Sequence, residues 1–357
     1  MGFIDHLSST QQFIFYSFVK IVLVILPVLG MVAYAVLAER KISAFIQDRL
    51  GPNRVGFPFL FGFGKRMGLG QPIADGIKFL LKEDFTPDHV RKVYFWLAPA
   101  IAMVPALLTV AVIPFGSNLG KQQMVIADLN VGILYTFGIV SLGVYGIVLA
   151  GYASNSKYPF LGGIRSSSQM ISYEIAMGMS VVPLFLLVGN LNLSQVISYQ
   201  AQHGWLIVWQ PISFIIFLVA AFAETNRLPF DLPESESELV GGYHTEYSSM
   251  KFALFFLGEY ANMIASAAMM VTLFLGGWTL PFAGLDQPAA PGQIVHGLLH
   301  IGIFIAKIMI LMLLFIWIRW MLPRFRYDQL MDLGWRRFIP LALLNILATA
   351  LVLYLQR

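Results

Sequence analysis

The chain has 357 residues, of which 58% are hydrophobic and 12% are charged, with a mean hydropathy of +0.73. Because soluble domains carry about a quarter charged residues, this composition excludes an ordinary soluble protein and indicates an integral membrane protein. The sequence has no cysteine, and its net charge is +4. The chain therefore cannot form disulfides, thiolate metal sites or an iron–sulfur cluster held by its own cysteines. Any redox chemistry must use a carrier in a partner or a diffusible lipid.

Eight apolar runs are long enough to cross a bilayer, since a spanning helix needs about 20 residues. The sequence therefore predicts an all-α integral membrane protein with about eight transmembrane helices, forming a single membrane domain over residues 1–357. The first run is too long for a cleaved signal peptide and ends in the charged sequence AERK. The expected spans are residues 13–38, 92–115, 130–152, 168–189, 206–223, 248–276, 295–318 and 337–356.

Lysine and arginine residues are concentrated on one side of this arrangement. The connection after the first span holds ten of the 23, and the connections after spans three, five and seven hold nine more. Positively charged connections remain on the cytoplasmic or matrix side of a membrane. We therefore expect both termini to lie on the opposite, outer side, and the connection between spans five and six to face inward.

The long connection after the first span contains a predicted amphipathic helix at about residues 62–84. Polar residues recur there at a spacing of four, three and four, and apolar residues occupy the other face. Such a helix is expected to lie in the membrane interface rather than to span the bilayer. The polar face holds Gln71, Asp75, Lys78 and Lys82, and the apolar face holds Met67, Ile73, Ile77, Leu80 and Leu81.

Several ionisable residues fall inside or at the ends of the predicted spans. An ionisable group at membrane depth costs at least about 2.5 kcal/mol, so its presence indicates a function and a partner inside the bundle. The alternative is an ion pair, for instance between Lys307 and Glu259, that only fixes the packing. The set comprises Glu174, Glu259 and Lys307 within spans four, six and seven, and Glu39 and Glu224 at the ends of spans one and five.

An acidic inner loop is predicted at about residues 224–247, and residues 224–259 hold seven of the nineteen acids. Acids two residues apart cannot share one helical face, and Pro229 and Pro233 disfavour regular helix, so we expect an irregular loop. Crowded, partly desolvated carboxyls can exchange protons near neutral pH, whereas a solvated acidic loop would have no such role. The residues alone leave both interpretations open. The loop acids are Asp231, Glu234, Glu236, Glu238 and Glu246.

Two weaker patterns have structural interpretations. His296 and His300 are four residues apart and could ligate a metal, but no third protein ligand is evident, so an interfacial location is favoured and no metal site is expected. Asn192-Leu-Ser194 is a formal glycosylation sequon, and a capped turn explains it equally well.

Five motifs occur in the same order as in one known family. They are AERKISAFIQDRLGPNRVG, QPIADGIKFLLKE, SNSKYPFLGGIRSSSQMISYE, AETNRLPFDLPESESELVGGYHTEYSSMKFALFFLGEY and PRFRYDQLMDLGW. The chain resembles the quinone-module membrane subunit of respiratory complex I, which is called the H subunit in the bacterial NADH:quinone oxidoreductase and is the counterpart of mitochondrial subunit one. The resemblance extends from the first predicted span to the start of the eighth.

The resemblance implies roles for two groups of residues. Members of the family form much of the chamber through which quinone approaches the last iron–sulfur cluster, and this chamber would be lined or supported by Glu39, Arg40, Arg49, Asp75 and Lys78. The family also has a chain of carboxylates that is thought to connect quinone reduction to proton movement, and its counterparts here are Glu174, Glu224, Asp231, Glu234, Glu236, Glu238, Glu246 and Glu259. Lys307 is grouped with this second set by its depth in the membrane.

The expected function is therefore that of a membrane subunit of a proton-pumping NADH:quinone oxidoreductase, which is not catalytic alone. Its substrate would be ubiquinone or menaquinone, and iron–sulfur clusters and flavin would belong to partner subunits. The partners would be the hydrophilic quinone-module subunits, small membrane-arm subunits and the lipid bilayer, without nucleic acid. A bacterial inner membrane is the expected location. The alternatives are a subunit of a related energy-converting hydrogenase, a stand-alone proton or ion transporter, and a purely structural anchor.

Overall fold

A computed structural model of the chain describes residues 9–56, 67–120, 122–233, 239–281, 284–290 and 293–356. Within these residues, seven helical segments are long and apolar enough to cross a membrane, which confirms the predicted fold class. The helices that correspond to predicted spans are α1 (Ser9–Ile46), α4 (Lys92–Leu108), α5 (Gly132–Ala153), α6 (Lys157–Val188), α9 (Pro211–Glu224), α11 (Ser249–Phe274), α12 (Ile294–Met321) and α14 (Ile339–Leu355).

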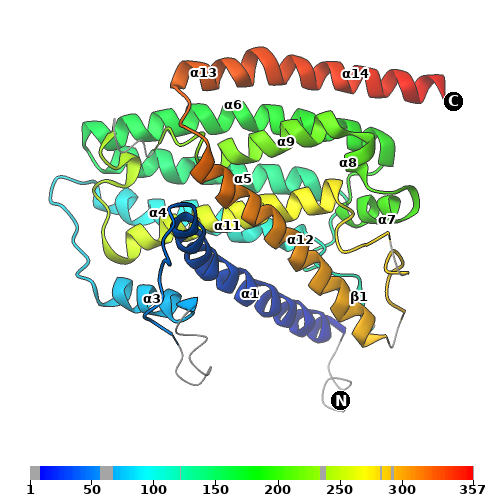
Figure 1. Cartoon of the computed structure of the whole chain (residues 1–357), viewed down its shortest axis with the longest axis horizontal. Coiled ribbons are helices and arrows are strands. Elements are labelled where there is room, and N and C mark those ends of the chain that lie inside the picture. The colour runs from blue at the N-terminus through cyan, green and yellow to red at the C-terminus, as the bar shows by residue number, and fades with distance from the viewer. Residues whose placement is uncertain are drawn as a thin grey trace.

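Shorter elements connect these helices. A 3-10 turn, η2 (Thr109–Val112), extends α4, and the hairpin of β1 (Asn118–Leu119) and β2 (Gln122–Gln123) precedes α5. The helix α1 begins and α14 ends toward the same end of the bundle (Figure 1). The remaining elements are α3 (Gln71–Leu81), α7 (Leu193–His203), α8 (Leu206–Trp209), η3 (Gly242–His244), α13 (Tyr327–Asp332) and a π-helical turn, η4 (Leu333–Phe338).

The fifth predicted span is broken near its start. Residues 206–223 were expected to form one helix, whereas the chain forms α8, then a bend at Gln210, then the 14-residue α9. Pro211 follows the bend, and proline is tolerated in the first turn of a helix because its missing N–H would be unpaired there. At about 1.5 Å per residue, α9 is only about 21 Å long. Its last residue, Glu224, is therefore held inside the protein rather than at its surface.

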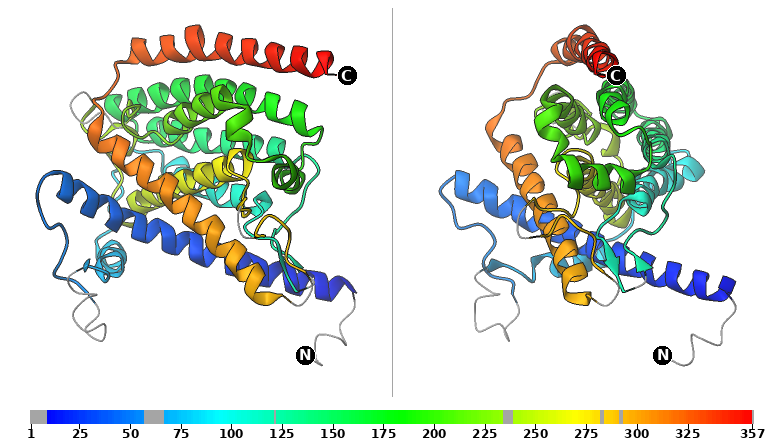
Figure 2. Two further views of the ribbon diagram at one scale, coloured as in Figure 1. Left: turned by 45° about the vertical axis from the view of Figure 1, so that its right-hand side comes forward. Right: turned by 90° about the vertical axis from the view of Figure 1, so that its right-hand side faces the viewer.

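The helices differ greatly in how much of their apolar surface the protein covers. In the most apolar part of α11, 67% of the residues are buried, compared with 17% in the segment Tyr327–Leu355 that contains α14. The helix α11 passes through the middle of the bundle, and α14 lies along one edge beside α6 (Figures 1 and 2). Because α11 is surrounded by α1, α4, α9 and α12, its polar side chains meet groups from several helices.

Small residues bring the helices into close contact. A Cβ atom at Gly146 of α5 would lie 2.5 Å from the backbone nitrogen of Ala102 in α4, and one at Gly151 would lie 2.5 Å from the carbonyl oxygen of Pro159 in α6. Membrane helices commonly use small residues in this way, because backbone approach strengthens van der Waals packing. Substitution of either glycine by a larger residue should separate α5 from its neighbour.

The predicted amphipathic helix is present but shorter than expected. It forms α3, which begins at Gln71 and ends before Lys82, where the backbone becomes extended. Residues 57–66 lie outside the described residues, so the expected start near residue 62 is not tested. The helix contacts α1 and α11. Its apolar side chains Ile73, Ile77, Leu80 and Leu81 are exposed, between 51% and 82%, so this face is available to lipid or a partner.

Candidate functional site

A compact ionic cluster lies where α1, α11 and α12 meet the segment after α9. We call Glu39, Arg227, Tyr260 and Arg319 the Glu39 cluster. Arg227 Nη1 lies 3.3 Å from Glu39 Oε2, and the Tyr260 hydroxyl donates a 2.6 Å hydrogen bond to the same oxygen. Arg319 donates to the other oxygen, Oε1. Glu39 is thus a buried carboxylate bound by two cations and one phenol.

The local sequence explains how the Glu39 cluster forms. The helix α1 continues to Ile46, so Glu39 lies inside a helix and faces the bundle. The chain leaves α9 at Glu224 and turns, which brings Arg227 beneath the end of α1. Burial lowers the pKa of Arg227, but Tyr260, Glu39 and Glu259 raise it more, so its pKa lies above the ordinary arginine value. Arg227 is a permanent buried cation.

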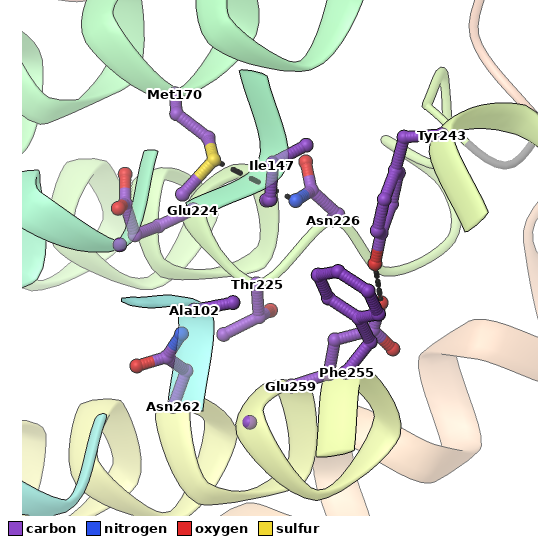
Figure 3. Close-up of a pocket in the computed structure, with 12 residues that line it drawn as sticks. Ala102, Ile147, Met170, Glu224, Thr225, Asn226, Tyr243, Phe255, Glu259 and Asn262 are labelled. Carbon is purple, nitrogen blue, oxygen red and sulfur yellow. Dashed lines mark hydrogen bonds between the residues drawn. The ribbon is translucent and has the colours of Figure 1, made fainter. Parts of the chain in front are cut away.

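Glu259 links the Glu39 cluster to a small internal cavity. Its carboxyl lies 4.0 Å from Arg227 Nη2 and accepts a 2.7 Å hydrogen bond from the Tyr243 hydroxyl. The cavity has a volume of about 20 Å³, and its lining includes Tyr243, Glu259, Asn262 and Glu224 (Figure 3). A cavity needs about 10–15 Å³ to hold one water molecule. This space, which both Glu259 and Glu224 line, can therefore hold one water.

Glu224 occupies an apolar interior without a direct partner. Its side chain is buried, and neither carboxyl oxygen has a hydrogen-bond partner among the described residues. A second cavity, also of about 20 Å³, is lined by Glu224, Asn262, Thr136 and Ser266 among others. Buried carboxyls without partners are costly, so water in the two cavities is the natural source of hydrogen bonds. Asn262, like Glu224, lines both cavities.

Glu174 is the next carboxyl along this path. It lies in α6, close enough to Glu224 to act on it electrostatically, and accepts a hydrogen bond from Ser141 of α5. The predicted carboxylates Glu259, Glu224 and Glu174 are therefore brought into one interior region, together with Glu39. They come from four different helices, and of the four only Glu224 and Glu259 share one of the five sequence motifs.

The acids of the inner loop do not share one environment. The buried Asp231 pairs with Arg324 at 2.9 Å, which joins the loop to the segment after α12. Glu246 lies 3.9 Å from His89 Nε2 at the other end of the loop. Glu234, Glu236 and Glu238 lie outside the described residues, so their predicted role in proton coupling is not tested.

Three of the predicted quinone-binding residues form a second group, the α3 cluster. It comprises Arg40, Asp75 and Lys78. Arg40 Nη1 lies 2.8 Å from Asp75, and Lys78 Nζ lies 3.7 Å from the same carboxyl. Arg49 lies apart, in the exposed turn after α1, and its side chain donates to Gln47. Arg40 and Lys78 keep side-chain exposures of 43% and 58%, so both can meet an incoming ligand.

An apolar cavity lies between the C-terminal halves of α1 and α12. It has a volume of about 140 Å³, and its lining includes Met31, Tyr34, Ala38 and Met312. Tyr34 also donates a 3.4 Å hydrogen bond to the carbonyl of Leu69, just before α3. Because Ala38 precedes Glu39 in α1, this apolar space lies beside both ionic clusters.

Lys307 occupies a different position from the carboxylates with which it was grouped. Its ammonium group donates to the carbonyl oxygens of Leu275, Gly277 and Thr279 at 2.6, 2.9 and 2.6 Å, and lies 4.7 Å from the ring centre of Trp205. An ammonium has three donors, and all three are used. Lys307 therefore binds the end of α11 rather than Glu259, so the alternative ion pair is not formed.

Sequence reasoning did not assign a site role to three arginines. Arg227, Arg319 and Arg324 were used only to orient the chain, yet each pairs with a predicted acid, Glu39 or Asp231. The sequence does contain a signal for such partners, because a buried acid at the end of a spanning helix requires a cation at the same depth. The choice of partner depends on helix packing, which spacing along the chain does not show.

The two weaker patterns have structural explanations. Asn192 accepts hydrogen bonds from the backbone of Ser194 and Gln195 as the N-cap of α7, which confirms the capped turn. His300 is buried and lies 2.7 Å from Ser117 Oγ, while His296 contacts Gln293. No group of three metal-ligating side chains occurs in the part of the chain that the structure describes.

Known proteins are similar to this sequence over nearly its whole length. A family profile described as NADH dehydrogenase matches residues 19–350. A protein from Cytophaga hutchinsonii, named as an H subunit of NADH-quinone oxidoreductase, is 50% identical over 323 residues, which cover 88% of this chain and 90% of the relative. A Geobacter metallireducens protein of the same name is 51% identical over 342 residues, with 94% and 96% covered. The corresponding protein from Flavobacterium johnsoniae is 46% identical over 348 residues, with 96% of each covered.

Proposed function

Because the chain belongs to the NADH dehydrogenase family, together with the H subunits of NADH-quinone oxidoreductases, we propose that it forms much of the quinone-access chamber of a proton-pumping NADH:quinone oxidoreductase. It is a membrane subunit of that oxidoreductase complex, a multi-pass protein, and is not catalytic alone. Its own residues receive the charge change of quinone reduction and pass it to the carboxylates inside the bundle. The substrate is a quinone.

The observation that carries this proposal is the position of Glu39 between two groups. On one side, the next residue, Arg40, belongs to the exposed α3 cluster. On the other side, Glu39 shares Arg227 with Glu259, which lines the same small cavity as Glu224. A charge that arrives near Arg40 can therefore act on the interior carboxyls through the adjacent Glu39 and one shared guanidinium.

Electrostatics gives the coupling a direction. Reduction adds negative charge to the quinone, which attracts the exposed cations Arg40 and Lys78. An anion beside Arg319, which is 23% exposed, competes with Glu39 for the same guanidinium. Glu39 then attracts Arg227 more strongly, which draws this guanidinium away from Glu259 and removes positive charge from beside that carboxyl. Coupled groups of this kind titrate as a cluster rather than as single residues.

The proposed partner subunits supply the redox groups that this chain cannot hold. The sequence has no cysteine, so the proposal assigns the iron–sulfur clusters and flavin to partner subunits. The exposed cations and the polar face of α3 would meet the hydrophilic quinone-module subunits, and the lipid-facing helices would meet small membrane-arm subunits. We assign the chain to a bacterial inner membrane with both termini on the outer side, in accord with its distribution of lysine and arginine.

A stand-alone ion transporter is less well supported. That alternative used Lys307 with Glu174 and Glu259 as a relay, whereas all three donors of Lys307 bind backbone carbonyls. The other alternative, a subunit of an energy-converting hydrogenase, is distinguished by the electron donor that the assembled complex uses. It would show activity with hydrogen or a ferredoxin-type donor and none with NADH.

The test uses the assembled complex in liposomes, with NADH-driven quinone reduction and proton uptake measured on the same sample. Arg319→Ala should lower quinone reduction and pumping together, because Glu39 then pairs with Arg227 alone. Glu259→Gln should lower pumping more than quinone reduction, since it removes a charge inside the bundle. Asp328→Asn is the matched control, because Asp328 is an inner-side acid that pairs only with the exposed Arg326 among the described residues.

Wild-type rates and pumping ratios in both variants, with normal assembly, would contradict the proposal. If the chain were a purely structural anchor, both variants should give that result, because neither side chain would then take part in coupling. Loss of activity in the Asp328 control to the same extent would also count against it, because the effect would then follow from any lost inner charge.

A further inference from the structure

A large apolar cavity lies in the outer half of the bundle, away from the carboxylates. Its volume is about 410 Å³, and it is enclosed by α1, α11, α12 and the segment from η2 to the β1–β2 hairpin. Neither the Glu39 cluster nor the α3 cluster contributes to its walls. The apolar walls include Val28, Ile113, Ala268, Phe304 and Ile308. Nothing in the proposed coupling path uses this space.

The cavity follows one face of α1. Residues of α1 that line it recur every three or four positions from Tyr16 to Met31, as expected for one side of a helix. Fifteen residues at about 1.5 Å each give a length of about 22 Å. One leaflet of a bilayer has a hydrocarbon depth of about 15 Å, which is half of the core. The cavity is therefore long enough to hold an extended lipid chain.

The polar residues of the lining mark one end of this groove. Lys20 and Tyr16 lie one turn apart on α1, and Gln122 comes from the hairpin. No carboxylate lines the cavity, and no ion pair of Lys20 occurs within the described ranges. The 18 residues between Lys20 and Glu39 are all uncharged, which at 1.5 Å each spans about 27 Å, close to a bilayer core of about 30 Å. With Glu39 at the inner boundary, Lys20 lies at the outer headgroups.

We propose that this cavity binds an acyl chain of an anionic phospholipid from the outer leaflet, with the phosphate at Lys20. A transmembrane helix of a partner is excluded by size, since a helix is about 10–12 Å wide with its side chains. A quinone tail would fill the apolar part but has no anionic group for Lys20. An anionic phospholipid satisfies both the apolar walls and the Lys20 cation at headgroup depth.

Photocrosslinking in proteoliposomes tests this assignment on the assembled complex. The vesicles are phosphatidylcholine with a trace of a phosphatidylglycerol or phosphatidylcholine probe that carries a photoreactive group on its acyl chain. In the wild type, the phosphatidylglycerol probe should label peptides of α1 and α12 at about five times the level of the phosphatidylcholine probe, the effect of one basic residue near an anionic headgroup. Lys20→Met should remove this preference, Lys20→Arg should keep it, and the exposed Lys157→Met should leave it unchanged.

A second variant separates the chain from the headgroup. Val28→Trp should fill the groove and reduce labelling by both probes while Lys20 is still present. Equal labelling by the two probes in the wild type, or a preference that survives Lys20→Met, would overturn the proposal. Displacement of the phosphatidylglycerol label by excess quinone, but not by excess unlabelled phosphatidylglycerol, would also overturn it, because the cavity would then be a quinone site. The readout is lipid contact, so it is independent of NADH oxidation.

Discussion

Glu39 and Arg40 are adjacent in α1, yet their side chains join different groups. Successive residues of a helix point about 100° apart. Glu39 turns into the bundle to Arg227 and Arg319, whereas Arg40 turns to Asp75 of α3. The last turns of α1 thus connect an exposed ionic group with a buried one. Rotation or displacement of this helix end would alter both at once.

Replacement of Glu39 by Gln should destabilise the subunit and lower quinone reduction. Glu39 and Arg227 have side-chain exposures of 9% and 5%, and loss of one partner of a buried pair costs about 3–5 kcal/mol. We expect less assembled complex in the membrane and a lower thermal midpoint of the remainder. Arg227→Lys should destabilise the subunit less than Glu39→Gln does. The positive charge is kept, although a lysine cannot contact Glu39 and Glu259 through two separate nitrogens as the guanidinium does.

These effects are measured by the amount of assembled complex on native gels and by its thermal unfolding. Asp328→Asn again supplies the control, since its ion pair with Arg326 lies on the surface. Wild-type assembly and thermal midpoint in Glu39→Gln would show that the Glu39 cluster does not stabilise the fold.

Alanine at Lys78 or Arg49 should raise the quinone KM. Lys78 belongs to the α3 cluster and is 58% exposed, so its removal takes away a cation from the proposed path of the ligand. Arg49 lies in the turn after α1 and contacts Gln47, so we expect a smaller rise. Steady-state kinetics with a short-chain quinone measure both, and Lys157→Ala on α6 is the control. Unchanged KM in both variants of a normally assembled enzyme would remove these residues from the quinone site.

Filling the space beside Glu224 should lower proton pumping more than it lowers the rate of quinone reduction. Asn262 lines the same two cavities of about 20 Å³ as Glu224. A leucine there is larger and has no polar group, so it excludes water from the path between Glu259 and Glu224. We expect Asn262→Leu to lower the ratio of protons pumped to NADH oxidised, while quinone reduction falls less. An unchanged ratio would show that proton coupling does not require water at these positions.

Sequence reasoning predicted the fold well because the signals are local. Long apolar runs identify the spanning helices, and the charge pattern of residues 71–82 identifies α3. The bend at Gln210 was not predicted, since the hydropathy of residues 206–223 is continuous and Pro211 is compatible with the first turn of a helix. The length of α1 was also underestimated, because Glu39 and Arg40 were read as the end of the span although both are good helix formers.

The candidate site was predicted only in part, for a physical reason. The acids are visible as rare charges in an apolar sequence, and Glu39, Glu174, Glu224 and Glu259 do lie in one interior region. Their partners come from distant segments, as in the pair of Glu39 with Arg319, and only the packing of α1 against α12 brings them together. Lys307 shows the converse case, because its depth suggested coupling whereas its contacts are with backbone carbonyls.

Lys307→Met should therefore affect stability more than coupling. Removal of the ammonium leaves three carbonyls without a donor at the end of α11, and each unpaired buried group costs about 1–3 kcal/mol. The positive charge also stabilises the negative end of the helix dipole, which methionine cannot do. We expect a lower thermal midpoint and less assembled complex, with a normal ratio of protons to NADH in the fraction that assembles. Lys307→Arg should recover part of the stability by donating to the same carbonyls. A normal thermal midpoint together with a reduced pumping ratio in Lys307→Met would instead assign Lys307 to the proton path.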